Sequence, residues 1–116
     1  MEKVVCGLCA SRHPLPVEEC IFPESIDPTD FKGMESAVER FILNRVGVES
    51  VCAQPINGND YTDTACWRGR RELVVYVTGL TAATAAVIKV CAFNGVRLTL
   101  MHFDRDAGSY IPQRIF

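Results

Sequence analysis

The chain has 116 residues, of which 48% are hydrophobic and 22% are charged, and its formal net charge at pH 7 is −2. This length and composition are those of one globular domain that can bury a core without metal or disulfide staples. A slightly acidic chain lacks the basic surface that attracts long nucleic acid, and no apolar run is long enough to cross a bilayer. We therefore expect a single domain over residues 1–116, with neither a membrane nor a long nucleic acid as its partner.

The expected cellular compartment decides how the cysteines are interpreted. The N-terminal stretch has no long apolar region with a small-residue cleavage site, so it is not a secretion signal and we expect a cytoplasmic protein. Cytoplasmic thiols stay reduced, and the six cysteines should be mostly core residues. Cys6 and Cys9, near His13, have a spacing that suits zinc or redox chemistry, but residues three apart on a strand point to opposite faces. We therefore expect no metal site there.

The first expected element is a strand at residues 4–10. This unbroken apolar run is closed by Ser11-Arg12-His13-Pro14, a pattern typical of a strand buried on both faces. Prolines keep the following stretch extended or turning, with room for a short strand near residues 20–22.

A helix should begin near residue 28. Asp27 can cap its free amides, Pro28 suits its first position, and Asp30 places negative charge at the positive end of the dipole. Gly47 ends the helix. Its apolar residues fall on one stripe and should pack on a sheet; they are Phe31, Met34, Val38, Phe41 and Ile42.

Residues 48–54 are expected to form another strand, whereas residues 55–71 are polar and contain two glycines, Tyr61, Trp67 and three arginines. We interpret residues 55–71 as a long loop or irregular hairpin, of the kind that often serves as a lid or binding segment. Disorder of this segment is an equally good interpretation.

The strongest strand pattern covers residues 72–77, and a helix over residues 82–93 follows it, apolar almost all round and stopped by Asn94-Gly95. Such a helix needs burial on more than one side, from a second subunit or from a central place in the fold. A strand over residues 96–103, a turn at residues 104–108 and an extended piece complete the chain. Strand, helix and strand with tight connections imply parallel pairing. The predicted fold class is α/β, a single Rossmann-like domain with a mostly parallel sheet flanked by helices.

Three polar segments leave the carboxyl ends of these strands, where ligands bind in open α/β sheets. They are Ser11-Arg12-His13, Thr78-Gly79-Leu80-Thr81 and His102-Phe103-Asp104-Arg105, and both histidines of the chain lie among them. Gly79 lets backbone approach closely, and the free amides of the next helix favour an anion; ordinary capping by Thr78 or Thr81 is the alternative. For Arg105, the alternative is an ion pair with Asp104 and Asp106 in a solvated turn.

This set of side chains suits metal-free cleavage of an RNA phosphodiester, in which a ribose 2′-hydroxyl attacks the neighbouring phosphorus. Arg12 or Arg105 would hold the developing charge, and His13 or His102 would move protons or orient the ribose. The predicted catalytic residues are Arg12, His13 and His102. The predicted substrate-binding residues are Ser11, Thr78, Gly79, Leu80, Thr81 and Arg105.

The order of these motifs resembles that of the Rossmann-like ring nucleases, small stand-alone CRISPR-associated proteins that accompany type III systems. The resemblance is carried by Ser11-Arg12-His13-Pro14, Ile26-Asp27-Pro28, residues 74–81, the helix that ends at Cys91, and Leu98-Thr99-Leu100. It implies a homodimer that binds cyclic oligoadenylate, with the four-adenosine ring expected, and cleaves it without metal or cofactor to switch off antiviral signalling. Arg12, His13 and residues 78–81 match the family pattern best, whereas His102 and Arg105 do not clearly match and the insertion at residues 57–71 departs from it.

Two other functions stay open. One is a non-catalytic module that holds a cyclic nucleotide as a sensor or sponge. The other is a regulatory interaction protein that uses the apolar helix, through residues such as Val87 and Val90, as its interface. Host recycling of the signal and viral counter-defence are equally compatible with the first hypothesis.

Overall fold

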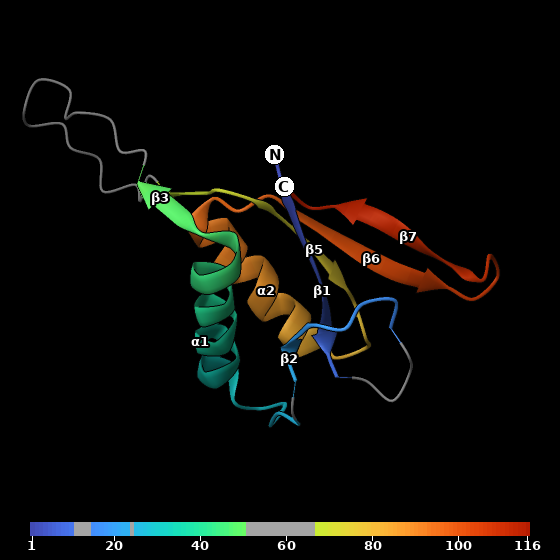
Figure 1. The fold of residues 1–116 in the computed structure, drawn as a ribbon. Helices are drawn as coiled ribbons and strands as arrows, with labels where there is room; N and C mark the ends of the chain where they lie inside the picture. The colour runs from blue at the N-terminus through green and yellow to red at the C-terminus, as the bar shows by residue number, and fades with distance from the viewer. Residues whose placement is uncertain (11–14, 24, 51–66) are drawn as a thin grey trace, which may run out of the picture.

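The structure is a computed structural model that describes residues 1–10, 15–23, 25–50 and 67–116 (Figure 1). The elements in chain order are β1 (Lys3–Cys9), β2 (Cys20–Phe22), α1 (Phe31–Phe41), the π-helical turn η1 (Ile42–Val46), β3 (Val48–Ser50), β4 (Trp67–Gly69), β5 (Glu72–Tyr76), α2 (Thr81–Asn94), β6 (Leu98–Asp104) and β7 (Ser109–Arg114). The predicted α/β class is confirmed, as a mixed sheet of mostly parallel strands with two helices in the described part of the chain.

The main sheet has the strand order β2-β1-β5-β6-β7. β1 pairs in parallel with both β2 and β5, and β5 pairs in parallel with β6. The extended piece after residue 108 is β7, which folds back antiparallel to β6. The predicted turn at residues 104–108 is present, closed by the Gly108 amide, which donates to the Asp104 carbonyl over 2.8 Å. The sheet therefore has a parallel centre and an antiparallel hairpin at one edge.

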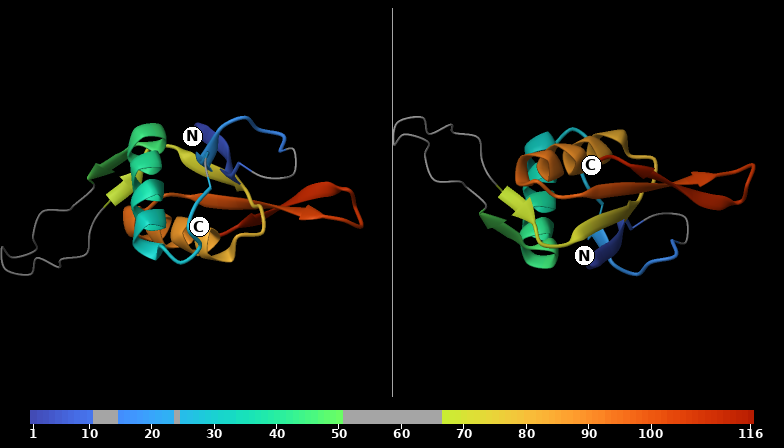
Figure 2. Two further views of the ribbon diagram at one scale, coloured as in Figure 1. Left: turned by 90° about the horizontal axis from the view of Figure 1, so that it is seen from below. Right: turned by 90° about the horizontal axis from the view of Figure 1, so that it is seen from above.

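Both described helices pack on the same face of this sheet. The register places Val4 beside Leu73 and Leu73 beside Leu98, and all three are buried in one cluster that also holds residues of α1 and α2. Helix α1 lies in front of the sheet seen from below and behind it seen from above (Figure 2). The core is therefore a single layer between the helices and one sheet face.

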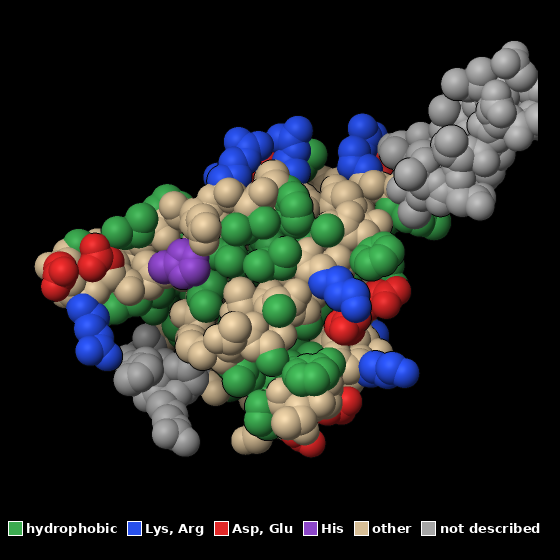
Figure 3. All heavy atoms as spheres, turned by 180° about the vertical axis from the view of Figure 1, so that it is seen from behind, with side chains coloured by type: hydrophobic (Ala, Val, Ile, Leu, Met, Phe, Trp, Pro, Cys, Tyr) green, Lys and Arg blue, Asp and Glu red, His purple; other side chains and the backbone are tan. Residues whose placement is uncertain are grey.

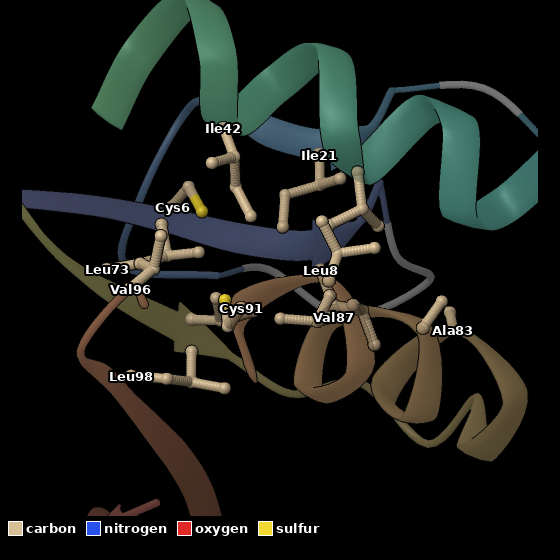
Figure 4. Packing of buried hydrophobic residues seen from close by; sticks show 14 of the residues in the cluster. Cys6, Leu8, Ile21, Ile42, Leu73, Ala83, Val87, Cys91, Val96 and Leu98 are labelled. Atoms are coloured by element: carbon tan, nitrogen blue, oxygen red, sulfur yellow. The ribbon is translucent and has the colours of Figure 1, made fainter. Parts of the chain in front are cut away.

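Helix α2 lies in the middle of this core, which explains its apolar sequence. Its five buried residues are Ala83, Ala86, Val87, Val90 and Cys91. Figure 4 shows Leu8 of β1 reaching toward Val87 of α2, with Ile42 close to the same strand. An ion pair of 2.9 Å between Lys89 and Glu35 also joins α2 to α1. The central place in the fold thus accounts for this burial, and Val87 and Val90 are core residues rather than a free interface.

The start of α1 differs from the predicted one. The helix begins at Phe31, and Asp30 is its N-cap, with Asp30 Oδ1 accepting from the Gly33 amide at 3.0 Å. Asp27 instead accepts from the amide and hydroxyl of Thr29, at 2.9 and 2.7 Å, so the prediction that Asp27 caps the helix and Pro28 opens it was wrong. Both aspartates are good caps, and the sequence placed the start one turn too early.

The end of the first helix and the next hairpin were partly predicted. Gly47, with φ +78°, follows η1, so the predicted stop is confirmed. β3 covers Val48–Ser50, and β4 pairs with it antiparallel, which favours the hairpin interpretation for the described end of the 55–71 segment. Residues 51–66 lie outside the described residues, and a lid there stays a prediction.

Gly95 ends α2 as predicted. Its φ is +62°, and its amide donates to the Cys91 carbonyl. A Cβ atom at this position would clash with the Trp67 carbonyl oxygen. Gly95 is therefore required by the left-handed turn and also by the close approach of β4.

Candidate functional site

Three strands that carry predicted site residues end at one edge of the sheet. Gly7 of β1 lies beside Tyr76 of β5, and Tyr76 lies beside Met101 of β6. The Val77 amide still donates to the Met101 carbonyl, over 3.0 Å, so β5 and β6 separate only after this point. The first exit segment, with Ser11, Arg12 and His13, lies outside the described residues, so its role stays a prediction.

The second exit segment forms a tight turn into α2. Gly79 has φ +57°, and the Leu80 amide donates to the Thr78 carbonyl over 2.6 Å. Leu80 is the N-cap of α2, and no side chain caps the helix. The expected alternative, capping by Thr78 or Thr81, is therefore absent. The first-turn N–H groups have no intrahelical partner, and such groups can donate to an anion.

The Thr78 hydroxyl adds a further polar group to this turn. Its oxygen is buried, and no hydrogen bond of regular geometry joins it to a described residue. The Cys9 thiol is its neighbour: burial raises the pKa of Cys9, and a weak hydrogen bond with the Thr78 side chain acts in the opposite direction. A buried hydroxyl beside uncapped helix amides can donate a hydrogen bond to a bound anion.

The cysteines of the described chain do not form a reactive or metal-binding centre. Burial raises the pKa of Cys6 and of Cys91 to about 12, and the pKa values of Cys9 and Cys20 are raised as well, chiefly by burial. A thiol is nucleophilic only as thiolate, so these shifts disfavour thiol redox chemistry. No group of three or more histidine, cysteine, aspartate or glutamate residues that could hold a metal ion occurs in the described ranges.

His102 lies on β6, one residue beyond the last pairing of β5 with β6. Its side chain is exposed, and its Nε2 lies 2.8 Å from Oε1 of Gln113 on β7. Strand alternation puts His102 on the same side of β6 as Leu98 and Leu100, which face the helices. His102 is thus near the edge of the candidate site, but one of its ring nitrogens is already engaged.

Arg105 lies in the turn that joins β6 to β7. It is exposed, and within the described ranges no carboxylate forms an ion pair with it. Asp104 accepts instead from the Asp106 amide at 3.0 Å. In Figure 3 acidic and basic side chains gather at the outer end of the molecule where this hairpin projects. The solvated ion pair expected as the alternative for Arg105 is therefore not formed.

The structure also brings together three aromatic rings that sequence reasoning missed. The centroids of Tyr76 and Tyr110 are 4.7 Å apart, and those of Phe103 and Tyr110 are 5.3 Å apart, both edge to face. Alternation along β5 and β6 indicates that Tyr76 and Phe103 share a face, but Tyr110 joins them only through the register of β7. That register was not readable from the sequence.

No protein-family model, curated protein or solved structure matches this chain. Among the helices that the structure describes, none is both long and apolar enough to span a membrane. The site and the sequence motifs are therefore the features from which a function can be inferred.

Proposed function

We propose that this chain is a ring nuclease, which binds cyclic oligoadenylate at the carboxyl edge of its parallel strands and cleaves the ring without a metal ion. The observation that carries the proposal is the turn from β5 into α2, where Gly79 is left-handed and no side chain caps the helix. Such a turn favours a phosphate group. The identity of the ligand comes from the resemblance of the motifs, which implies cyclic tetra-adenylate as the substrate.

The proposed reaction is an internal transfer at phosphorus. The ribose 2′-oxygen forms a bond to the adjacent phosphorus, the bond from phosphorus to the 5′-oxygen breaks, and a 2′,3′-cyclic phosphate remains. The 2′-hydroxyl gives its proton to a base, and the leaving 5′-oxygen gains one. The α2 amides and the Thr78 hydroxyl would hold the charged phosphate oxygens.

Arg12 and His13 are proposed as the charge-holding and proton-moving groups, since both match the family pattern. His102 is the alternative base. Its Nε2 is paired with Gln113, so His102 would use Nδ1 or exchange this partner on ligand binding. Arg105 has no competing ion pair in the described chain and would bind a second phosphate.

The finer features of the fold and assembly belong to the same proposal. A homodimer that binds the ring across its two-fold axis follows from the resemblance, whereas a Rossmann-like relationship and a place in the cytoplasm are expected from the sequence pattern. The parallel centre of the sheet, with ligand groups at its carboxyl edge, supports this fold assignment.

Incubation with labelled cyclic tetra-adenylate in EDTA tests the proposal. We expect linear products from the wild-type chain and a loss of rate of about 100-fold or more for His13→Ala, the usual scale for removal of a general acid or base. His102→Ala is the matched variant and should lose less. Failure of the wild-type chain to bind the ring would contradict the proposal.

A second candidate is a sensor or sponge that binds the ring without cleaving it. One observation favours it: the histidine that the structure describes is already hydrogen-bonded to Gln113. This candidate predicts tight binding with the ring left intact in the same assay. It also predicts that His13→Ala lowers affinity without changing any rate of cleavage.

A further inference from the structure

The face of the main sheet opposite the helices carries the cluster of three aromatic rings. Along β5, Leu73 and Val75 are fully buried under the helices, whereas Val74 and Tyr76 alternate with them and are only partly buried. Phe103 pairs with Tyr110 across β6 and β7, and it is 54% exposed. The three rings therefore lie together on the side of the sheet where the structure places no helix.

The rings form a corner rather than a flat stack. Tyr110 meets Tyr76 at an interplanar angle of 78° and Phe103 at 72°. Edge-to-face contacts are favourable and hold the rings in place. A flat ligand can then lie against one ring and touch the edge of the next, as bases do on the aromatic side chains of an exposed sheet.

This aromatic corner is close to the turn that we propose binds phosphate. Tyr76 precedes Thr78 by two residues, which span at most about 7 Å of chain. A nucleotide with its base on the rings and its phosphate at the start of α2 would have to cross the carboxyl edge of the sheet, because Tyr76 faces away from the helices.

Both signs of charge lie near the corner, since Asp104 and Asp106 flank Arg105, and the arginines are the groups that can meet an anionic ligand. Five arginines of the described chain are paired with glutamates; they are Arg45, Arg68, Arg70, Arg71 and Arg97. Arg105 lies in the turn before β7, the strand that carries Tyr110, and Arg114 is the last residue of β7. Neither forms an ion pair with a described carboxylate. Arg105 is therefore available to a phosphate, and Arg114, whose Nε donates to the Phe116 carbonyl over 3.4 Å, can offer its remaining N–H groups to another.

We propose that Tyr76, Phe103 and Tyr110 form a stacking site for a nucleobase, with Arg105 and Arg114 on either side to meet its phosphates. This inference rests on the proposed function, because it names the group that would hold a base of the cyclic oligonucleotide. It also accounts for the aromatic side chains on the open face of the sheet, which do not contribute to the packing of the helices.

Titration with adenosine 5′-monophosphate, followed by NMR of the aromatic side chains, tests the stacking site. We expect saturable upfield shifts of the ring protons of Tyr76, Phe103 and Tyr110, since a stacked base shields them. Ribose 5-phosphate, which has no base, should leave these resonances in place. Shifts confined to the amides of residues 78–84, or no shift at all, would overturn the inference.

Two variants separate stacking from general damage. Phe103→Leu should weaken adenosine 5′-monophosphate roughly 5- to 150-fold, the range that follows from the loss of one base–aromatic stack. Phe31→Leu alters a phenylalanine on α1 that is 59% exposed, and it should bind as the wild type does. Equal affinities for the two variants would overturn the stacking site.

The outcomes also distinguish this site from the proposed function. If the wild-type chain cleaves cyclic tetra-adenylate and Phe103→Leu binds adenosine 5′-monophosphate as tightly as the wild type, the ring nuclease is supported and the stacking site is refuted. Ring-proton shifts without binding of the cyclic ligand would support the stacking site and remove the ring nuclease. If the chain self-associates and the ring-proton shifts are absent at every protein concentration tested, the face is an interface between copies of the chain and the stacking site is refuted.

Discussion

The two faces of the main sheet are built from alternate residues of the same strands, yet they differ sharply in burial. On the face under the helices, Leu73 is 0% exposed and Leu98 is 1% exposed. On the opposite face, Val5 is 43% exposed and Phe103 is 54% exposed. The helix-covered face therefore provides most of the stability, and the open face keeps apolar side chains in contact with solvent, where they are free to meet a ligand.

The largest difference between the faces should appear on truncation of a large side chain. Leu73→Ala should lower the free energy of unfolding by about 2–5 kcal/mol, because it leaves a cavity in the closed layer. Phe103→Ala should lower it by about 1 kcal/mol, chiefly through the lost contact with Tyr110. Urea denaturation of both variants checks this, and equal losses would mean that the open face is covered in solution.

A smaller but better matched comparison uses two neighbours on β5. Val75 is fully buried under the helices, and Val74 is partly buried on the other face. Val75→Thr should cost about 1–3 kcal/mol, since it buries a hydroxyl in an apolar layer. Val74→Thr keeps the β-branched shape and should cost less than about 1 kcal/mol. Thermal unfolding would contradict the assignment of faces if the order were reversed.

The buried thiol of Cys91, on the helix-covered side of the sheet, predicts how the free energy of unfolding depends on pH. The pKa of Cys91 is about 12 in the folded chain, because of burial, against 9.0 for an ordinary cysteine. The folded state then holds its proton more tightly, so this contribution to stability is complete below pH 9 and is lost as the pH rises from 9 to 12. Between pH 7 and pH 10 the loss is about 1.4 kcal/mol for this thiol.

Cys91→Ala is the variant that isolates this contribution. Between pH 7 and pH 10 the free energy of unfolding should fall for both proteins, but the fall should be about 1.4 kcal/mol smaller for the variant than for the wild type. This difference does not depend on how much the substitution destabilises the chain at neutral pH. Parallel pH profiles for the two proteins would show that Cys91 is not buried as described.

The closed face was largely predictable from sequence, because its signals are local. The β-branched run at residues 72–77 and the stop at Gly95 each depend on a few adjacent residues, and both are confirmed by β5 and by the end of α2. The true cap of α1 was missed because Asp27 and Asp30 are equally good caps. Only the contact of each aspartate with Thr29 or Gly33 decides between them.

The open face could not be predicted, because it depends on pairings between distant segments. The corner of Tyr76, Phe103 and Tyr110 needs β7 to fold back on β6 in one register, and a shift by one residue would point Tyr110 to the other side. The uncapped start of α2 was also hidden, since Thr78 and Thr81 are both residue types that cap helices. Ser11, Arg12 and His13 remain a prediction from the sequence.

Affinity for cyclic tetra-adenylate in two variants of Gly79 tests the central claim most directly. Asparagine and aspartate both tolerate the left-handed conformation of this residue, and a Cβ atom there meets no neighbour within 4 Å. The two variants therefore differ mainly in charge beside the start of α2. We predict that Gly79→Asp binds at least about 10-fold more weakly than Gly79→Asn, since its carboxylate occupies the place of the ligand phosphate. Equal affinity for both variants would contradict a phosphate-binding site at this turn.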